Sequence, residues 1–279
     1  MTLEEKYNKL KEILSEMGGV AVGFSGGVDS TLLLKVANET LQDRAVGVTA
    51  TSFSFPEREL KEAKRLGKRI GADLRIVHTE EGANPQFFNN PVNRCYFCRS
   101  ELFTKMSVIA EKEGLRYLAD GTNTDDDYDF RPGSMAQRKF NVRSPLREAG
   151  LNKSEIRELA KRLGLDNHDK PAFACLASRI PYGSEIKPEI LRMVEKAEGF
   201  LNQLGFSSVR VRHYGNTARI EVGVKELNKI TENGVRRKII TALKEIGYTY
   251  ITLDLEGFRS GSMNEVIDKE KIKTSVDNQ

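Results

Sequence analysis

Six consecutive residues near the start of the chain have the composition of a phosphate-binding turn: Ser25-Gly26-Gly27-Val28-Asp29-Ser30. Gly26 and Gly27 let the backbone approach a ligand closely and turn its N–H groups inward. The start of the helix that follows adds positive potential at the same point. Ser25 and Ser30 supply hydroxyl donors, and we expect Asp29 to hold Mg²⁺ against phosphate oxygens. The turn is not a Walker loop, because no lysine occupies the position that G-x-x-x-x-G-K-[ST] requires.

Three cysteines form the second group of residues that could do chemistry: Cys95, Cys98 and Cys175. An odd number of cysteines argues against a disulfide framework. A C-x-x-C pair brings two thiolates within reach of one metal ion or cluster, and a distant third cysteine can complete the site. Zinc would take a fourth ligand, for which His78 and His168 are candidates, whereas a [4Fe-4S] cluster held by three cysteines keeps one iron open. The structural alternative is that Cys175 is a small buried apolar residue.

The pattern of apolar residues predicts alternating helices and strands over the first part of the chain. The predicted helices cover residues 3–17, 30–41, 56–70, 99–114 and 153–163, and the predicted strands cover 19–24, 45–51, 74–78, 117–120 and 142–146. This alternation is typical of a parallel sheet covered by helices on both faces. We therefore predict an α/β fold, with a parallel-sheet nucleotide-binding domain at residues 1–170.

Loops that follow the C-terminal ends of parallel strands meet at one edge of a sheet, where ligands bind. The phosphate-binding turn follows the first predicted strand and Thr51 ends the second, while the C-x-x-C pair lies in the loop 79–98 and Gly121-Thr122-Asn123 follows the fourth strand. We therefore expect Thr51 and Gly121 to join the nucleotide site. Glycine and asparagine also favour plain turns, which is the alternative interpretation of residues 121–123.

A loop rich in Pro, Ala and Ser at about 166–182 interrupts the pattern, so we predict a domain boundary there and a smaller α+β domain at residues 171–279. Its pattern predicts helices over 187–204, 224–231 and 233–246, strands over 208–213, 217–222 and 249–254, and a hairpin at Gly215-Asn216. Five side chains in this part could bind phosphate or carboxylate groups: Ser178, Arg179, Arg210, Arg212 and Arg259. Arg210 and Arg212 share one face of a predicted strand. For each arginine, an ordinary surface position is the alternative.

Composition and charge narrow the classes of protein to which the chain can belong. It has 279 residues, with 44 basic and 40 acidic side chains and a net charge of +4. This near-balance argues against a nucleic-acid partner. No stretch approaches the roughly 20 apolar residues that span a bilayer, and the first residues lack the apolar core of a signal peptide. We therefore expect a cytoplasmic protein with no membrane partner.

The phosphate-binding turn resembles the SGGxDS signature of the PP-loop ATP pyrophosphatases, which implies cleavage of ATP to AMP and pyrophosphate. Together with NRCYFC, DGTN, SPL and ACLASRIPYG, it resembles the LarE family of ATP-dependent sulfur transferases over most of the chain. This resemblance implies an enzyme of nickel-pincer cofactor biosynthesis. Such an enzyme adenylates a carboxylate of pyridinium-3,5-biscarboxylic acid mononucleotide and replaces oxygen by sulfur. The resemblance also implies ATP and Mg²⁺ as cofactors, catalytic roles for Asp29 and the cysteines, and a homo-oligomer.

Members of this family differ in how they supply sulfur. Some lose the sulfur of one cysteine, at the position that corresponds to Cys175, whereas members with three cysteines hold a [4Fe-4S] cluster that takes up external sulfide. The presence of Cys95, Cys98 and Cys175 makes this chain similar to the three-cysteine type, with sulfide or another sulfur donor as its partner. Three alternatives stay open: an iron–sulfur tRNA thiolation enzyme, a non-catalytic nucleotide- or metal-binding regulator, and an amidotransferase that uses ammonia and would not need the cysteines.

Overall fold

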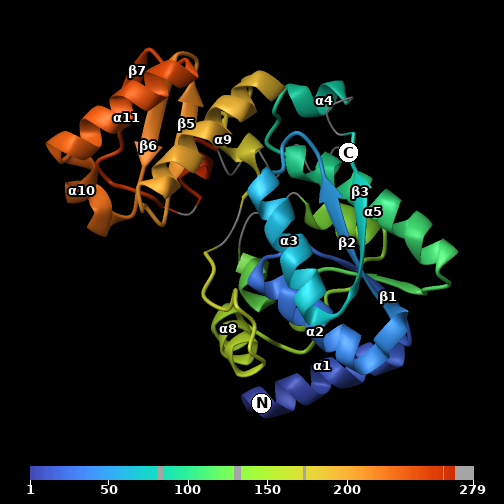
Figure 1. Cartoon of the computed structure of the whole chain (residues 1–279). Helices are drawn as coiled ribbons and strands as arrows, with labels where there is room; N and C mark the ends of the chain where they lie inside the picture. The colour runs from blue at the N-terminus through green and yellow to red at the C-terminus, as the bar shows by residue number, and fades with distance from the viewer. Residues whose placement is uncertain (81–83, 129–132, 172–173, 260, 268–279) are drawn as a thin grey trace. The chain divides into compact units, whose positions relative to one another are not determined.

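The computed structural model describes residues 1–80, 84–128, 133–171, 174–259 and 261–267 (Figure 1). The chain divides into two compact units: unit 1 comprises Met1–Phe87 and Asn93–Phe173, and unit 2 comprises Phe88–Val92 and Ala174–Gln279. The predicted domains meet at residue 170, whereas the units change after residue 173. Unit 2 also takes in residues 88–92, for which the sequence pattern offers no indication.

Unit 1 is built on a sheet of four parallel strands among the described residues, in the order β3-β2-β1-β4. The strands are β1 (Val20–Gly23), β2 (Ala45–Thr51), β3 (Asp73–His78) and β4 (Tyr117–Ala119). Apolar residues run continuously along β1 because both faces of the sheet are covered by helices. The predicted α/β class with a parallel sheet is confirmed.

Helices cover both faces of this sheet (Figure 1). One face packs on α1 (Leu3–Met17), α2 (Val28–Leu41), α3 (Glu57–Ile70) and α8 (Lys153–Arg162), and the other packs on α5 (Arg94–Lys112) and α6 (Ser134–Lys139). Val20 and Val22 of β1 belong to the first core, and Ala21 between them belongs to the second. This alternation is what the two-residue period of a strand requires.

Two local predictions for unit 1 are wrong. The helix predicted over 99–114 is α5, which begins at Arg94, so the C-x-x-C pair lies on its first turn and not in a loop. The strand predicted over 142–146 is reduced to an isolated bridge between Ala119 and Arg143. Pro145, which has no N–H to donate to a sheet, begins the short helix α7 (Pro145–Glu148) instead.

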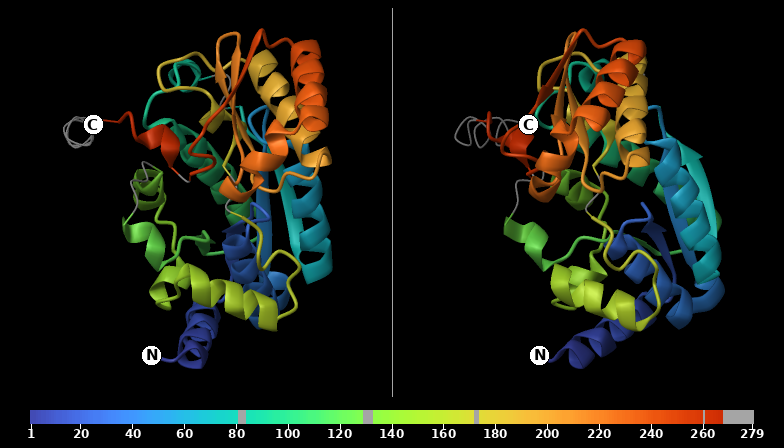
Figure 2. Two further views of the ribbon diagram at one scale, coloured as in Figure 1. Left: turned by 90° about the vertical axis from the view of Figure 1, so that its left-hand side faces the viewer. Right: turned by 60° about the vertical axis from the view of Figure 1, so that its left-hand side comes forward.

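Unit 2 contains a sheet of three strands in the described residues, in the order β5-β6-β7. These are β5 (Arg210–Tyr214), β6 (Thr217–Glu221) and β7 (Tyr250–Leu253), with α9 (Pro188–Gln203), α10 (Leu227–Thr231) and α11 (Asn233–Ile246) as its helices. The predicted hairpin joins β5 and β6, which pair antiparallel, and β7 pairs parallel to β6. The helices α9 and α11 lie side by side (Figure 2) and share an apolar core with the strands.

The two faces of the second sheet differ in chemistry. Val211, Ala218 and Ile220 lie in the apolar core under the helices. Because side chains alternate along a strand, Arg212 of β5 and its register partner Arg219 of β6 lie on the opposite face. The strand pattern thus gathers charged side chains on one surface of unit 2.

Acidification should destabilise unit 2 through His213, which is buried with its ring centroid 5.7 Å from that of Tyr248. Burial lowers the pKa of His213 below its ordinary value. As the pH falls below about 6.5, the unfolded chain therefore binds a proton that the folded chain excludes. Stability is complete above this pH and decreases by up to about 1.4 kcal/mol per pH unit as the pH falls toward the folded pKa.

Urea unfolding of the full chain at about pH 7.5 and about pH 5.5 measures this loss of stability. The variant His213→Phe keeps a ring but cannot titrate, so its stability should depend less steeply on pH. His78→Gln, at the exposed end of β3, is the matched control and should retain the wild-type dependence. An unchanged pH dependence in His213→Phe would contradict the assignment.

Candidate active site at the phosphate loop

The predicted phosphate-binding turn joins the C-terminal end of β1 to the first turn of α2. Its hydroxyl groups already organise the loop: Ser25 Oγ lies 3.2 Å from Ser30 Oγ and accepts from Gly27 N–H at 3.3 Å. Ser30 Oγ and Thr31 Oγ1 both donate to the carbonyl of Gly27, at 3.1 and 2.8 Å. The N–H groups of the first turn of α2 have no acceptor inside the helix and carry the positive end of its dipole. The loop is therefore a cradle for an anion.

Asp29 lies at the start of α2 and contacts two side chains, Asn123 from the loop after β4 and Lys153 from the start of α8. Its Oδ1 accepts from the amide of Asn123 at 3.3 Å, and its Oδ2 forms an ion pair with Lys153. Asn152 and Glu155 form a capping box that begins α8, which fixes the backbone at Lys153, the first residue of this helix. The sequence pattern gives no sign that Lys153 pairs with Asp29, because the two residues are 124 positions apart.

The loop after β4 packs tightly against the phosphate loop. A Cβ added to Gly121 would come within 2.9 Å of Ser30 N and 3.2 Å of the carbonyl carbon of Asp29. On the other side, Gly26 has φ +72°, and a Cβ there would come within 3.2 Å of the backbone of Ala63 in α3. The close approach of three segments explains why both positions are glycine.

Replacing Gly121 by alanine should weaken the site, because the added methyl group meets backbone atoms that cannot rotate away. We expect the dissociation constant for ATP to rise by about tenfold and the free energy of unfolding to fall by about 1–3 kcal/mol. Calorimetric titration with ATP and urea unfolding measure the two effects. Gly199→Ala is the matched control, since its Cβ on helix α9 meets no described atom within 4 Å. Equal behaviour of the two variants would contradict this close contact.

The structure brings together most of the predicted nucleotide-binding residues: Ser25, Gly26, Gly27, Asp29, Ser30 and Gly121. Thr51 lies at the C-terminal end of β2, on the same edge of the sheet, and its carbonyl accepts from Thr79 N–H at 3.0 Å. No hydrogen bond between the side chain of Thr51 and the phosphate loop is found among the described residues. Its role in the site stays a prediction.

The three cysteines divide between the units. Cys95 and Cys98 lie on the first turn of α5 in unit 1, and Cys175 immediately precedes η4 (Leu176–Arg179) in unit 2. All three lie in the described part of the chain, form no disulfide there and are exposed or partly exposed. No cluster of three or more His, Cys, Asp or Glu side chains that could hold a metal ion is formed within the described residues. Convergence of the three thiols stays a prediction.

Arg179 is fully buried and uses every nitrogen of its guanidinium in contacts with protein oxygens. Nε and one terminal nitrogen donate to Glu198 at 2.8 and 2.9 Å, and the other terminal nitrogen donates to the carbonyls of Ala174 and Cys175 at 2.6 and 2.9 Å and to Ser178 Oγ. Ser178 Oγ donates to the Cys175 carbonyl at 2.8 Å. These contacts fix the backbone at Cys175, a role that sequence reasoning missed.

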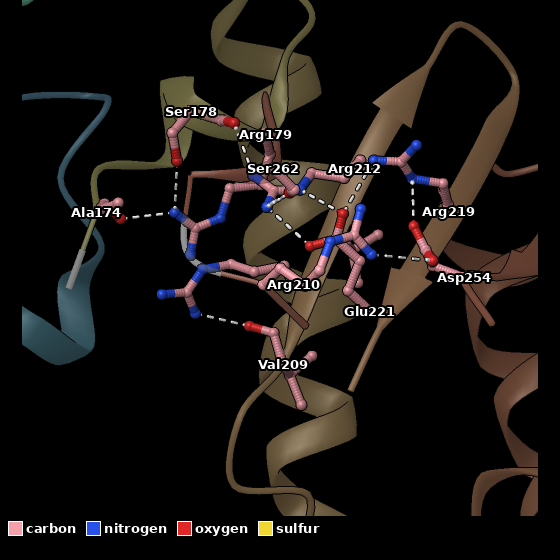
Figure 3. A network of polar contacts seen from close by, with 12 residues as sticks. Ala174, Ser178, Arg179, Val209, Arg210, Arg212, Arg219, Glu221, Asp254 and Ser262 are labelled. Carbon is pink, nitrogen blue, oxygen red and sulfur yellow. Dashed lines mark hydrogen bonds and ion pairs between the residues drawn. The ribbon is translucent and has the colours of Figure 1, made fainter. Parts of the chain in front are cut away.

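Arg212 is also buried and is the centre of a polar network (Figure 3). It donates to both carboxylate oxygens of Glu221 at 3.0 and 2.7 Å, to the Ser178 carbonyl at 3.0 Å and to Ser262 Oγ at 3.1 Å. Glu221 is inaccessible to solvent and also accepts from Arg219 at 2.9 Å, so one carboxylate separates two guanidinium groups. The network holds these arginines in fixed positions.

Arg210 and Arg259 are more exposed than Arg212. Arg210 packs over the ring of Phe258, with its guanidinium carbon 5.0 Å from the ring centroid. It also donates to the Val209 carbonyl at 2.7 Å (Figure 3). Arg259 pairs with three carboxylates, of which the shortest contact is 2.8 Å. An anionic ligand would compete with these carboxylates for the arginine.

No helix among the described residues has the length and apolar composition needed to cross a membrane.

Residues 2–88 match the family model of NAD synthase. The chain is 42% identical to an uncharacterised protein from Synechocystis (96% of this chain, 100% of that protein) and 30% identical to one from Methanocaldococcus jannaschii (93% and 100%). It is 35% identical to the pyridinium-3,5-bisthiocarboxylic acid mononucleotide synthase of Lactiplantibacillus plantarum, over 98% of this chain and 99% of that protein.

Proposed function

Because the chain belongs to the LarE family of PP-loop enzymes, we propose that it is an ATP-dependent, AMP-forming sulfurtransferase. Its substrate would be pyridinium-3,5-biscarboxylic acid mononucleotide. ATP would transfer AMP to a substrate carboxylate and release pyrophosphate, and a sulfide would then displace AMP to leave a thiocarboxylate. The observation that carries the proposal is the phosphate loop, where Asp29 lies among the N–H and hydroxyl groups of an anion cradle.

The phosphate loop suits the first half-reaction. A carboxylate is a poor electrophile, and adenylation bonds one of its oxygens to the α-phosphorus of ATP, so that this oxygen can later leave as part of AMP. N–H groups from the first turn of α2, with the hydroxyls of Ser25 and Ser30, would stabilise the departing pyrophosphate. Asp29 is the residue that would hold Mg²⁺, since a carboxylate oxygen is the ligand that this ion prefers and the ion would neutralise pyrophosphate charge. Lys153 would leave the carboxylate when the ion binds.

Three thiols suit the second half-reaction. Cys95 and Cys98 are three residues apart on the first turn of α5, so they lie on one face of the helix. Together with Cys175 they would make a donor set of three thiolates, which fits a [4Fe-4S] cluster with one open iron better than a structural zinc site with four protein ligands. Such a cluster, when bound, would present a sulfide as the nucleophile. Arg179 and Ser178 would keep the backbone of Cys175 in place during the reaction.

Unit 2 supplies groups for the anionic mononucleotide. Arg210 and Arg259 are partly exposed guanidinium groups that could exchange a protein contact for a phosphate or carboxylate. Arg212 is held by Glu221 and Ser178, so we propose that it contributes a fixed positive charge. Direct contact of Ser178 or Arg179 with the substrate would require them to release bonds within the protein.

The proposal is tested with full-length protein purified without oxygen. The protein is assayed for iron and acid-labile sulfide, then incubated with ATP, Mg²⁺, sulfide and the dicarboxylate mononucleotide. Expected results are about four irons per chain, release of pyrophosphate that depends on the mononucleotide, and a product whose mass reflects exchange of one oxygen for sulfur. Omission of the mononucleotide is the control.

Each component of the proposal has its own contrary outcome. Pyrophosphate release without a sulfur-containing product would leave an adenylating enzyme and exclude the sulfurtransferase. One tightly bound zinc in place of iron would exclude the cluster but not the ATP chemistry. Salt-sensitive binding of bulk tRNA in a gel-shift assay, with thiolated tRNA as product, would favour the tRNA enzyme instead.

A further inference from the structure

The segment 167–170 of unit 1, which has no role in the proposed chemistry, contacts the phosphate loop. Asn167 is buried, with only 3% of its surface exposed, and its amide donates to the Gly26 carbonyl at 3.1 Å and to Thr31 Oγ1 at 2.9 Å. Lys170 Nζ lies 3.5 Å from the same carbonyl and pairs with Glu59 at 2.6 Å. Two side chains of one segment therefore bind a single carbonyl of the loop.

The direction of this carbonyl fixes the direction of an N–H group. In a trans peptide the C=O and the following N–H point in opposite directions. Because the Gly26 carbonyl faces Asn167, the N–H of Gly27 faces away from it, toward Ser25 Oγ at 3.3 Å. Thr31 Oγ1 accepts from Asn167 and donates to the Gly27 carbonyl at 2.8 Å, which orients the next peptide in the same way.

The loop needs such a contact because its own backbone does not select one orientation. Gly26 and Gly27 lack a Cβ, and Gly26 has φ +72°, so alternative orientations of this peptide are accessible to the chain. The segment that selects one of them is itself held by α8. Arg157 donates to the carbonyls of His168 and Lys170 at 2.9 and 2.8 Å.

We infer that Asn167 is a positioning residue for nucleotide binding, which holds the Gly26–Gly27 peptide in the orientation in which its N–H faces Ser25 Oγ and away from Asn167. The inference rests on the proposed function, since it requires that this loop bind ATP. Asn167 acts through the loop and is not itself a ligand of the nucleotide. Loss of the Asn167 side chain should therefore weaken the binding of each ligand in proportion to its phosphate contacts. The binding of adenosine, which has no phosphate, should not change.

Two substitutions remove the amide donor with different side effects. Asn167→Asp keeps the shape and adds a charge, and Asn167→Leu keeps the approximate volume without a charge. The dissociation constants of ATP, inorganic pyrophosphate and adenosine are measured by calorimetry with the full chain. We expect both variants to raise the dissociation constants of ATP and pyrophosphate by about tenfold. The dissociation constant of adenosine should change by less than about twofold.

The matched control is Asn38→Asp, which removes another amide-to-carbonyl bond of unit 1, to Ile70 at 3.4 Å, from farther along α2. It should leave all three dissociation constants unchanged. The positioning role would be overturned if adenosine and ATP lost affinity equally. It would also be overturned if only Asn167→Asp, and not Asn167→Leu, bound ATP more weakly. If the wild-type protein binds neither ATP nor pyrophosphate, the proposed function fails together with this inference. Wild-type binding with unchanged Asn167 variants removes the inference alone.

Discussion

Replacing Asp29 by asparagine should reduce Mg²⁺-dependent release of pyrophosphate by at least about 100-fold. Asparagine keeps the shape of the side chain and an oxygen for Asn123 but cannot neutralise a divalent cation. The fold should survive, because the ion pair that is lost joins side chains that are 30% and 23% exposed and such pairs contribute at most about 1 kcal/mol. Pyrophosphate release across a Mg²⁺ titration and urea unfolding measure the two quantities.

Lys153→Met is the informative companion, since it breaks the same ion pair from the other side. If Asp29 binds Mg²⁺, removal of the competing lysine should lower the Mg²⁺ concentration at half-maximal rate, whereas Asp29→Asn should raise it. The opposite directions distinguish a metal ligand from a partner in a structural ion pair. Equal effects of the two variants on rate and on Mg²⁺ dependence would contradict the assignment of Asp29.

The arrangement of the segments around the phosphate loop follows from signals that are local in the sequence. An apolar run, a Gly-Gly turn and a helical pattern predict the strand, the loop and α2, and the parallel sheet then brings Gly121 to the same edge. The Gly215-Asn216 hairpin is predicted correctly for the same reason, because the turn chemistry is contained in two residues.

The two wrong elements show where local pattern is ambiguous. Residues 94–98 lack a strong helical period, yet they continue the helix because Phe103 and Met106 of the same helix are buried against the sheet. Tertiary packing determines where this helix begins. Residues 142–146 have the apolar composition of a strand, but Pro145 cannot donate to a sheet and begins a helix instead.

The partners of the charged residues are not visible in the sequence, because they depend on contacts between distant segments. Arg179 pairs with Glu198 from α9, and Lys153 pairs with Asp29 across 124 positions. The strand period does predict that Arg210 and Arg212 share a face, but it does not predict that Glu221 of the neighbouring strand binds Arg212 on both oxygens. The buried carboxylate of Glu221 lies next to two arginines because of the pairing register of β5 and β6, which the sequence pattern does not determine.

Replacing Cys175 by serine should abolish formation of the thiocarboxylate, while the first release of pyrophosphate per chain still occurs at the wild-type rate. A serine hydroxyl keeps the size of the side chain but is neither a thiolate nucleophile nor a ligand for iron at neutral pH. The Cys175 carbonyl, which binds Ser178 and Arg179, is unchanged by the substitution, so the local backbone should persist. Product mass, pyrophosphate and iron content are measured on the same preparations.

The variants Cys95→Ser and Cys98→Ser distinguish between two sources of sulfur, an external sulfide held by a cluster and the sulfur of Cys175 itself. If three thiolates hold a cluster, each of the three variants should lose iron and sulfur transfer together, and the wild-type chain should keep its mass through many turnovers. If Cys175 gives up its own sulfur, Cys95→Ser and Cys98→Ser should remain active for one turnover, and the wild-type chain should lose the mass of hydrogen sulfide. Two cysteines on one turn of α5 have no role in the second mechanism, so full activity without either of them would exclude the cluster.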